Sequence, residues 1–230
     1  MPYRCPATPY EAAFLRDSIF RERGINQRVD ITIHTPGKRP MAVAGPVVGD
    51  VLLGMLAERE ITYGGEHRVS RIDPASRKIL FDGAEASYDL LVGAPPHKAP
   101  QVVIEAGLTD SSGYIPVHPQ TLEVFTDVEN LKTDYTGVYS IGDVTTITLL
   151  NMMPLPKAGV FAEAEARVVA QSIEASIAGK PGTLGFDGRG ACHVDIGGGL
   201  AAFAGGNFYA SPYHQEKEEY EQVLDTWFVR

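Results

Sequence analysis

The two cysteines, Cys5 and Cys192, are the residues of this chain best suited to redox chemistry. Cys5 directly precedes the segment TPYE (8–11), which has the pattern of a capping box with proline at the first helical position. The positive end of a helix, together with the adjacent Arg4, favours the reactive thiolate over the thiol. The alternative is that each cysteine is a small buried hydrophobic residue without redox chemistry.

A second candidate site is the segment TGVYSIGD (136–143), in which an apolar strand ends at Gly142 and Asp143. Cofactors bind at strand ends in α/β sheets, and a glycine there lets a ligand approach the backbone closely. The aspartate can accept a hydrogen bond from a sugar-like hydroxyl. The alternative is an ordinary Gly-Asp turn.

Composition excludes several other classes of function. The chain has 230 residues and a net charge of −9, and it contains no cluster of Lys and Arg that could neutralise a phosphate backbone, so no nucleic-acid partner is expected. Two cysteines are too few for a disulfide scaffold, and no Cys-x-x-Cys zinc spacing occurs, so no metal site is expected.

Hydrophobic periodicity predicts helices that alternate with strands, and hence an α/β fold of three layers followed by a small α+β C-terminal unit. Soft boundaries divide the chain into 1–118, 119–180 and 181–230. The predicted elements are helices over 8–24, 47–60 and 157–179, strands over 29–35, 88–96 and 136–143, and a β-hairpin over 67–81.

Four segments resemble a known family. The pattern Thr-x4-Val-Tyr-x-Ile-Gly-Asp (133–143) resembles the second FAD-binding motif of the two-dinucleotide-binding-domain flavoproteins, whose folds are Rossmann-like. LPKAGVFAEAEARVVAQSI (155–173) is similar to the segment beneath the flavin ring in sulfide:quinone oxidoreductases and flavocytochrome c sulfide dehydrogenases. RCPATPYEAAFL (4–15) and GACHVDIGGGLAAF (190–203) resemble their two redox-cysteine regions.

The resemblance implies FAD as the cofactor and assigns roles to particular residues. Asp143, following Gly142, would hold the ribityl chain of the flavin. The start of the next helix, at Lys157, Ala158 and Gly159, would present backbone N–H groups and a positive dipole end to the reduced flavin ring.

The resemblance also implies a reaction. Sulfide would attack a Cys5–Cys192 disulfide and leave a persulfide, on Cys192, while Cys5 would add to the flavin and pass two electrons to it. A quinone or a cytochrome c would then accept the electrons. The alternative is a truncated, non-catalytic flavoprotein-like fragment or assembly module that needs another chain for FAD.

Two glycine motifs of the family are missing from this sequence. CPATPYE (5–11) stands where NADH-using relatives carry Gly-x-Gly-x-x-Gly, which argues against nicotinamide binding and against a type 2 NADH dehydrogenase. The first FAD-binding βαβ unit, which grips the ADP half, has no counterpart either. The chain is therefore expected to be the C-terminal part of such a flavoprotein.

The location and assembly of the protein are left open by the sequence. No apolar run approaches the length of a membrane span, and no signal segment is visible, so a cytoplasmic or peripheral membrane location is expected. A periplasmic location would require an N-terminal signal that has been lost. Trp227 and Phe228 have three candidate roles, which are core packing, a homodimer contact or a peripheral membrane contact.

Overall fold

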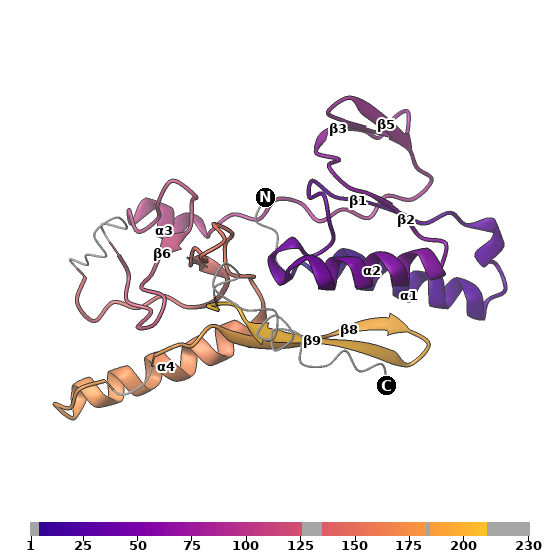
Figure 1. Ribbon diagram of the computed structural model, residues 1–230. Helices are drawn as coiled ribbons and strands as arrows, with labels where there is room; N and C mark the ends of the chain where they lie inside the picture. The colour runs from indigo at the N-terminus through magenta and orange to yellow at the C-terminus, as the bar shows by residue number, and fades with distance from the viewer. Residues whose placement is uncertain (1–4, 126–134, 183–184, 211–230) are drawn as a thin grey trace.

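The computed structural model describes residues 5–125, 135–182 and 185–210 (Figure 1). Arg4, Thr133, Trp227 and Phe228, to which the sequence analysis gives roles, lie outside these ranges. The helices are α1 (Thr8–Glu22), α2 (Pro46–Glu58), α3 (Gln101–Glu105) and α4 (Gly159–Ile177), with 3-10 turns η1 (Asn26–Arg28), η2 (Ala42–Ala44) and η3 (Gly142–Val144). The strands are β1 (Thr32–His34), β2 (Thr62–Gly64), β3 (Val69–Asp73), β4 (Lys78–Phe81), β5 (Ala84–Ser87), β6 (Ile115–Pro116), β7 (Thr145–Thr146), β8 (Arg189–Gly197) and β9 (Leu200–Asn207).

Helix α1 forms where the sequence predicts it. Pro9 lies in its first turn, and Gly24 ends it with a φ of 64°, a conformation that glycine adopts without strain. The predicted capping box is wrong, because the cap residue is Ala7 in a helical conformation and no side chain caps the helix. Thr8 is instead the first helical residue, so its hydroxyl does not occupy the capping position.

The N-terminal part is built around one βαβ unit. Strands β1 and β2 pair in parallel, with Thr32 opposite Thr62, and helix α2 connects them. Leu52 and Leu56 of α2 and Phe14 of α1 are fully buried in the same hydrophobic cluster. This parallel crossover confirms the α/β class that the alternation of helices and strands predicts.

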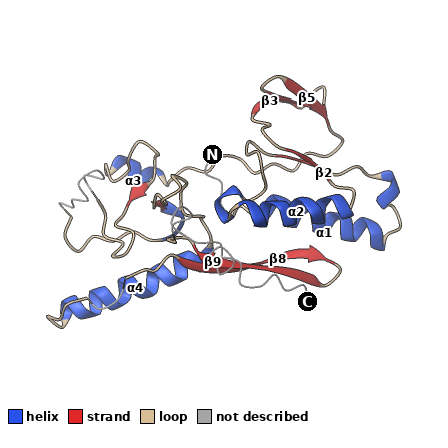
Figure 2. Cartoon of the chain, in the orientation of Figure 1, coloured by secondary structure: helices blue, strands red, loops and turns tan. Residues whose placement is uncertain are grey.

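The antiparallel sheet β3-β4-β5 contains the predicted hairpin, with Asp73 opposite Lys78. The strand predicted over 88–96 is wrong, since the third strand of this sheet is β5 and the chain after it is irregular. Leu90 and Val92 are 74% and 57% exposed, respectively. Within the residues that the structure describes, no strand pairs with this apolar run, and Figure 2 shows it as loop.

A second hydrophobic cluster forms around α4, which confirms the helix predicted over 157–179. Phe161 and Val168 of α4 pack there with Ile115 of β6. The strand predicted over 136–143 is wrong, because the backbone makes only an isolated bridge at Tyr139 before entering the turn η3. Apart from this bridge and the start of η3, residues 136–143 are therefore irregular.

The hairpin β8–β9 connects the two clusters and is the described part of the predicted C-terminal unit. Val194 and Ile196 of β8 are buried with α1, whereas Gly190, nearer the start of β8, lies against Phe161 of α4. In Figure 1 the hairpin accordingly extends from the start of α4 to α1. The boundaries near 118 and 180 stay predictions.

Candidate functional site

Cys5 lies immediately before α1 and is held by main-chain hydrogen bonds on both sides. Its N–H donates to the carbonyl of Lys157 at 2.8 Å, and its own carbonyl accepts from the N–H of Thr8 at 3.0 Å. Cys5 has a φ of 49°, which is uncommon for a residue other than glycine. The structure therefore brings the expected redox cysteine into direct contact with the segment expected to lie beneath the flavin.

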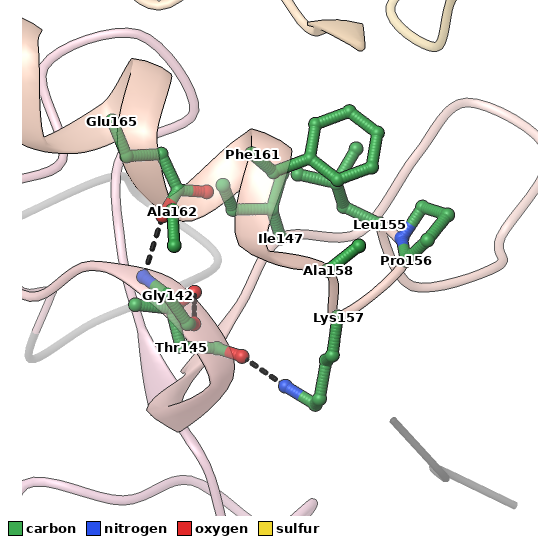
Figure 3. Close-up of a pocket in the computed structure, with 10 residues that line it drawn as sticks. All are labelled: Gly142, Thr145, Ile147, Leu155, Pro156, Lys157, Ala158, Phe161, Ala162 and Glu165. Atoms are coloured by element: carbon green, nitrogen blue, oxygen red, sulfur yellow. Dashed lines mark hydrogen bonds between the residues drawn. The ribbon is translucent and has the colours of Figure 1, made fainter. Parts of the chain in front are cut away.

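Gly142 and Asp143 begin the turn η3, which faces the first turns of α4. Gly142 has a φ of 72°, and a Cβ at this position would lie 3.3 Å from the Cβ of Ala162. A side chain here would be both strained and crowded, so the turn requires glycine. The Gly142 N–H donates to the Glu165 carboxylate at 2.5 Å, which fixes the turn on the helix (Figure 3).

Lys157 lies between the turn and the redox cysteine. Its Nζ donates to the main-chain carbonyl of Thr145, as Figure 3 shows, and stands 3.8 Å from the centroid of the Tyr114 ring. Thr145 in turn donates its hydroxyl to the carbonyl of Gly142 at 2.8 Å. A series of hydrogen bonds thus connects the Gly142 turn to Lys157, and Lys157 to Cys5.

The N-terminus of α4 presents main-chain donors. Ala158 has extended backbone angles and Gly159 is the first helical residue, with no side-chain cap at this end. The Phe161 N–H donates to the Ala158 carbonyl at 3.1 Å, and the helix dipole places partial positive charge at this end. Gly159 is exposed, so this end is accessible to a ligand.

A shallow pocket lies between the turn and the helix. Ten residues line it (Figure 3), namely Gly142, Thr145, Ile147, Leu155, Pro156, Lys157, Ala158, Phe161, Ala162 and Glu165. The predicted residues Gly142, Lys157 and Ala158 therefore share one pocket. The other three predicted residues do not line the pocket. Asp143 and Gly159 are the sequence neighbours of Gly142 and Ala158, and Cys5 is hydrogen-bonded to Lys157.

Glu165 is the residue of this site that the sequence analysis missed. Its side chain is only 2% exposed, and burial raises the pKa of its carboxyl group, an effect opposed by the Gly142 N–H and by the charge of Lys157. Glu165 lies four residues after Phe161 and three before Val168, on the buried stripe of α4. A charged residue on the apolar stripe of a predicted helix is the sequence signal that could have identified it.

Cys192 lies on β8, where its backbone is opposite Ala204. Gly190, two residues before Cys192, lies against Phe161 in the first turn of α4. Val194, two residues after Cys192, is buried in the hydrophobic cluster that includes Phe14 of α1. The side chain of Cys192 lies outside the described part of the structure. Its pairing with Cys5 stays a prediction.

Two further properties concern only residues 5–125, 135–182 and 185–210. Within these ranges, no three His, Cys, Asp or Glu side chains are grouped closely enough to hold a metal ion. No helix there combines the length and the apolar character needed to cross a membrane.

Comparison with known proteins extends these observations. No protein-family model matches the chain. The mouse protein named "Sulfide:quinone oxidoreductase, mitochondrial" is 21% identical over an alignment 240 positions long, which covers 97% of this chain and 49% of the mouse protein. The chain therefore spans about half the length of this curated relative.

Solved structures share the fold. The sulfide:quinone oxidoreductase of the hyperthermophilic bacterium Aquifex aeolicus superposes with a TM-score of 0.75 and 22% identity, over 88% of this chain and 48% of that one. A chain in the mitochondrial ATP synthase of Tetrahymena thermophila superposes with a TM-score of 0.67 and 15% identity, over 92% of this chain and 50% of that one.

The fold of the described residues is thus one already seen in solved structures. Over nearly all of its length, this chain is similar in sequence and in fold to about half of a sulfide:quinone oxidoreductase, which confirms the resemblance predicted from its motifs.

Proposed function

We propose that this chain forms the sulfide-reacting and flavin-facing part of an FAD-dependent oxidoreductase. One observation carries the proposal, which is the 2.8 Å hydrogen bond from the N–H of Cys5 to the carbonyl of Lys157. This bond joins the two segments that resemble the redox-cysteine and flavin-facing segments of the same family. The sequence similarity to sulfide:quinone oxidoreductases supports sulfide as the substrate.

The residues at the turn suit the polar groups of a flavin. Gly142 provides a backbone without a Cβ, and the partly exposed Asp143 provides a carboxylate that can accept a hydrogen bond from a ribityl hydroxyl. The N–H groups near Gly159 suit an anionic ring. FAD, when bound, supplies the two-electron acceptor that the cysteine chemistry requires.

The proposed reaction of sulfide with the two cysteines conserves atoms and electrons without a further reactant. Hydrosulfide attacks the Cys192 sulfur of a Cys5–Cys192 disulfide, so that one S–S bond forms as the other breaks. The product is a persulfide on Cys192, with the electron pair of the broken bond on the Cys5 thiolate. A quinone or cytochrome c is the proposed final acceptor.

Flavin binding and reduction test the proposal. The 230-residue chain, incubated with FAD and separated from free FAD, is expected to retain a flavin absorbance that sulfide bleaches without oxygen. Asp143→Ala should weaken flavin binding, whereas Asp89→Ala, at a fully exposed aspartate, should not. Flavin that binds equally well to both variants would contradict the role of Asp143. Bound flavin that sulfide does not bleach would contradict the proposed reaction.

A non-catalytic assembly module is the second candidate. The superposition on a chain of the Tetrahymena mitochondrial ATP synthase favours it. The same fold is present there in an assembly that is not named for sulfide oxidation, and a fold alone does not specify a function. A folded chain that retains no FAD and whose cysteines do not react with sulfide would support this second function.

A further inference from the structure

Glu165 is a buried carboxylate to which the proposed chemistry assigns no task. It lies in the second turn of α4 with 2% of its surface exposed. Burying a carboxylate is costly unless hydrogen bonds and opposite charge compensate it. An apolar residue would fill this position on the buried stripe at lower cost, so the carboxylate must make a specific interaction.

That interaction is with the main chain of the flavin turn. Glu165 Oε2 accepts a hydrogen bond from the Gly142 N–H at 2.5 Å, and Figure 3 shows the side chain directed at the turn. Gly142 is the first residue of η3 and follows Ile141, which has extended backbone angles. Without Glu165 the N–H would be left unsatisfied in a partly buried site.

The same turn is connected to Cys5 by three more hydrogen bonds. Thr145 Oγ1 donates to the Gly142 carbonyl at 2.8 Å, and Lys157 Nζ donates to the Thr145 carbonyl. The Lys157 carbonyl then accepts from the Cys5 N–H at 2.8 Å. These bonds form a continuous series of contacts from a buried side chain on α4 to the backbone before α1.

We propose that Glu165 is a positioning residue that holds the Gly142–Asp143 turn against α4 and, through Thr145 and Lys157, fixes the backbone at Cys5. This role deepens the proposed function and rests on it, since the turn and Cys5 are there assigned to flavin and to sulfide. In this proposal Glu165 acts through the turn and Cys5, and not on FAD or sulfide directly.

The charges around Glu165 are consistent with this role. The charge of Lys157 favours the ionised carboxylate, while burial and the charge of Asp143 disfavour it. Burial raises the pKa of the Tyr209 phenol, and the charge of Glu165 adds to this effect. The hydrogen bond needs an acceptor oxygen at position 165, and the side-chain amide of glutamine provides one without charge.

The test uses the full chain without flavin or sulfide, so its result does not depend on whether the proposed reaction occurs. The protein is first reduced with a phosphine, because the proposed Cys5–Cys192 disulfide would block alkylation. Hydrogen exchange at the Gly142 amide and iodoacetamide labelling of the Cys5 peptide are then measured in Glu165→Ala, Glu165→Gln and Glu163→Gln. Glu163 is the matched control, because it lies on the same helix but is exposed and bonded to Arg167.

Glu165→Ala is expected to speed exchange at Gly142 about tenfold to hundredfold, since the N–H loses its acceptor. The same variant should label Cys5 faster. Glu165→Gln should restore both rates to near the wild-type values, and Glu163→Gln should change neither. Recovery with glutamine distinguishes hydrogen-bonded positioning from simple packing or charge.

Unchanged rates in a folded Glu165→Ala protein would overturn the proposal, as would a failure of glutamine to restore them. If the alanine variant does not fold, Thr145→Val provides the decisive measurement. It removes the hydroxyl donor to Gly142 and should speed exchange there about threefold and label Cys5 faster. Wild-type rates in Thr145→Val would also overturn the proposal.

Discussion

Gly190 of β8 lies against the ring of Phe161, so replacing it with alanine forces a methyl group into that ring. A Cβ at position 190 would lie 2.2 Å from Cε1 and 2.6 Å from Cζ of Phe161. Carbon atoms in favourable contact are about 3.5–4.0 Å apart. The strand or the ring must therefore move by more than about 1 Å to accept the methyl group.

The ring has little room to move. Phe161 is 5% exposed and is packed edge-on between Phe186 and Phe208, with ring centroids 6.4 Å and 5.2 Å away, respectively. Overpacking of this kind costs about 1–3 kcal/mol, and the confined ring places Gly190→Ala in the upper half of that range. The strand that carries Cys192 would be displaced from α4 at the same time.

Urea unfolding followed by circular dichroism measures the effect, and Gly54→Ala is the matched control. Gly54 is an exposed helical residue of α2, and a Cβ there would have no atom within 4 Å. Gly54→Ala is expected to stabilise the protein by about 0.5–1 kcal/mol through a stiffer unfolded chain and better helix propensity. The same chemical change therefore has opposite signs at the two positions.

A Gly190→Ala protein as stable as the wild type would refute the reasoning about β8 and α4. The double variant Gly190→Ala, Phe161→Leu provides a second check, because the smaller side chain gives the new methyl group space. Its loss of stability should be less than the sum of the losses of the two single variants. Additive losses would show that the two positions do not contact each other.

Three further predictions concern other parts of the fold. Leu52→Ala removes a fully buried side chain of α2 and should lower the free energy of unfolding by about 2–5 kcal/mol in urea titration. The pKa of His34 is lowered from 6.5 first by burial and then by the charge of His67, whose Nδ1 lies 2.7 Å from the Nδ1 of His34. Because the unfolded chain then binds the proton more tightly than the folded protein, the free energy of unfolding should fall as pH drops below about 6.5. His34→Gln should reduce this loss in urea midpoints measured at several pH values, while the exposed His193→Gln should leave it unchanged. Asp17→Asn removes a buried carboxylate that binds two arginines of the N-terminal part and should cost about 1–3 kcal/mol, measured by the same titration.

The elements that sequence predicts well are those fixed by local interactions. Gly24 and Gly179 end α1 and α4 with positive φ, and each helix carries its own apolar stripe. The hairpin β3–β4 follows from its turn, in which the Asp73 side chain accepts hydrogen bonds from the N–H groups of Ala75 and Ser76. Each of these signals lies within a few residues of the structure that it specifies.

The features that sequence could not predict depend on distant partners. Leu90 lies in an apolar run typical of a strand, yet it is 74% exposed, and no strand in the described part of the chain pairs with this run. The hydrogen bond between Cys5 and Lys157 joins two loops whose approach depends on how both hydrophobic clusters pack. Glu165 can be recognised as a charge on an apolar stripe, but its partner, the Gly142 N–H, is known only from the structure.

The central claim is that Cys5 and Cys192 form a redox pair that reacts with sulfide. A non-reducing peptide map of the freshly purified, alkylated protein tests it directly, before and after sulfide treatment. A redox pair is expected to give a linked Cys5–Cys192 peptide that sulfide converts to a persulfide on Cys192 and a free thiol on Cys5. Two free thiols in a folded protein, neither modified by sulfide, would show that the two cysteines are not such a pair.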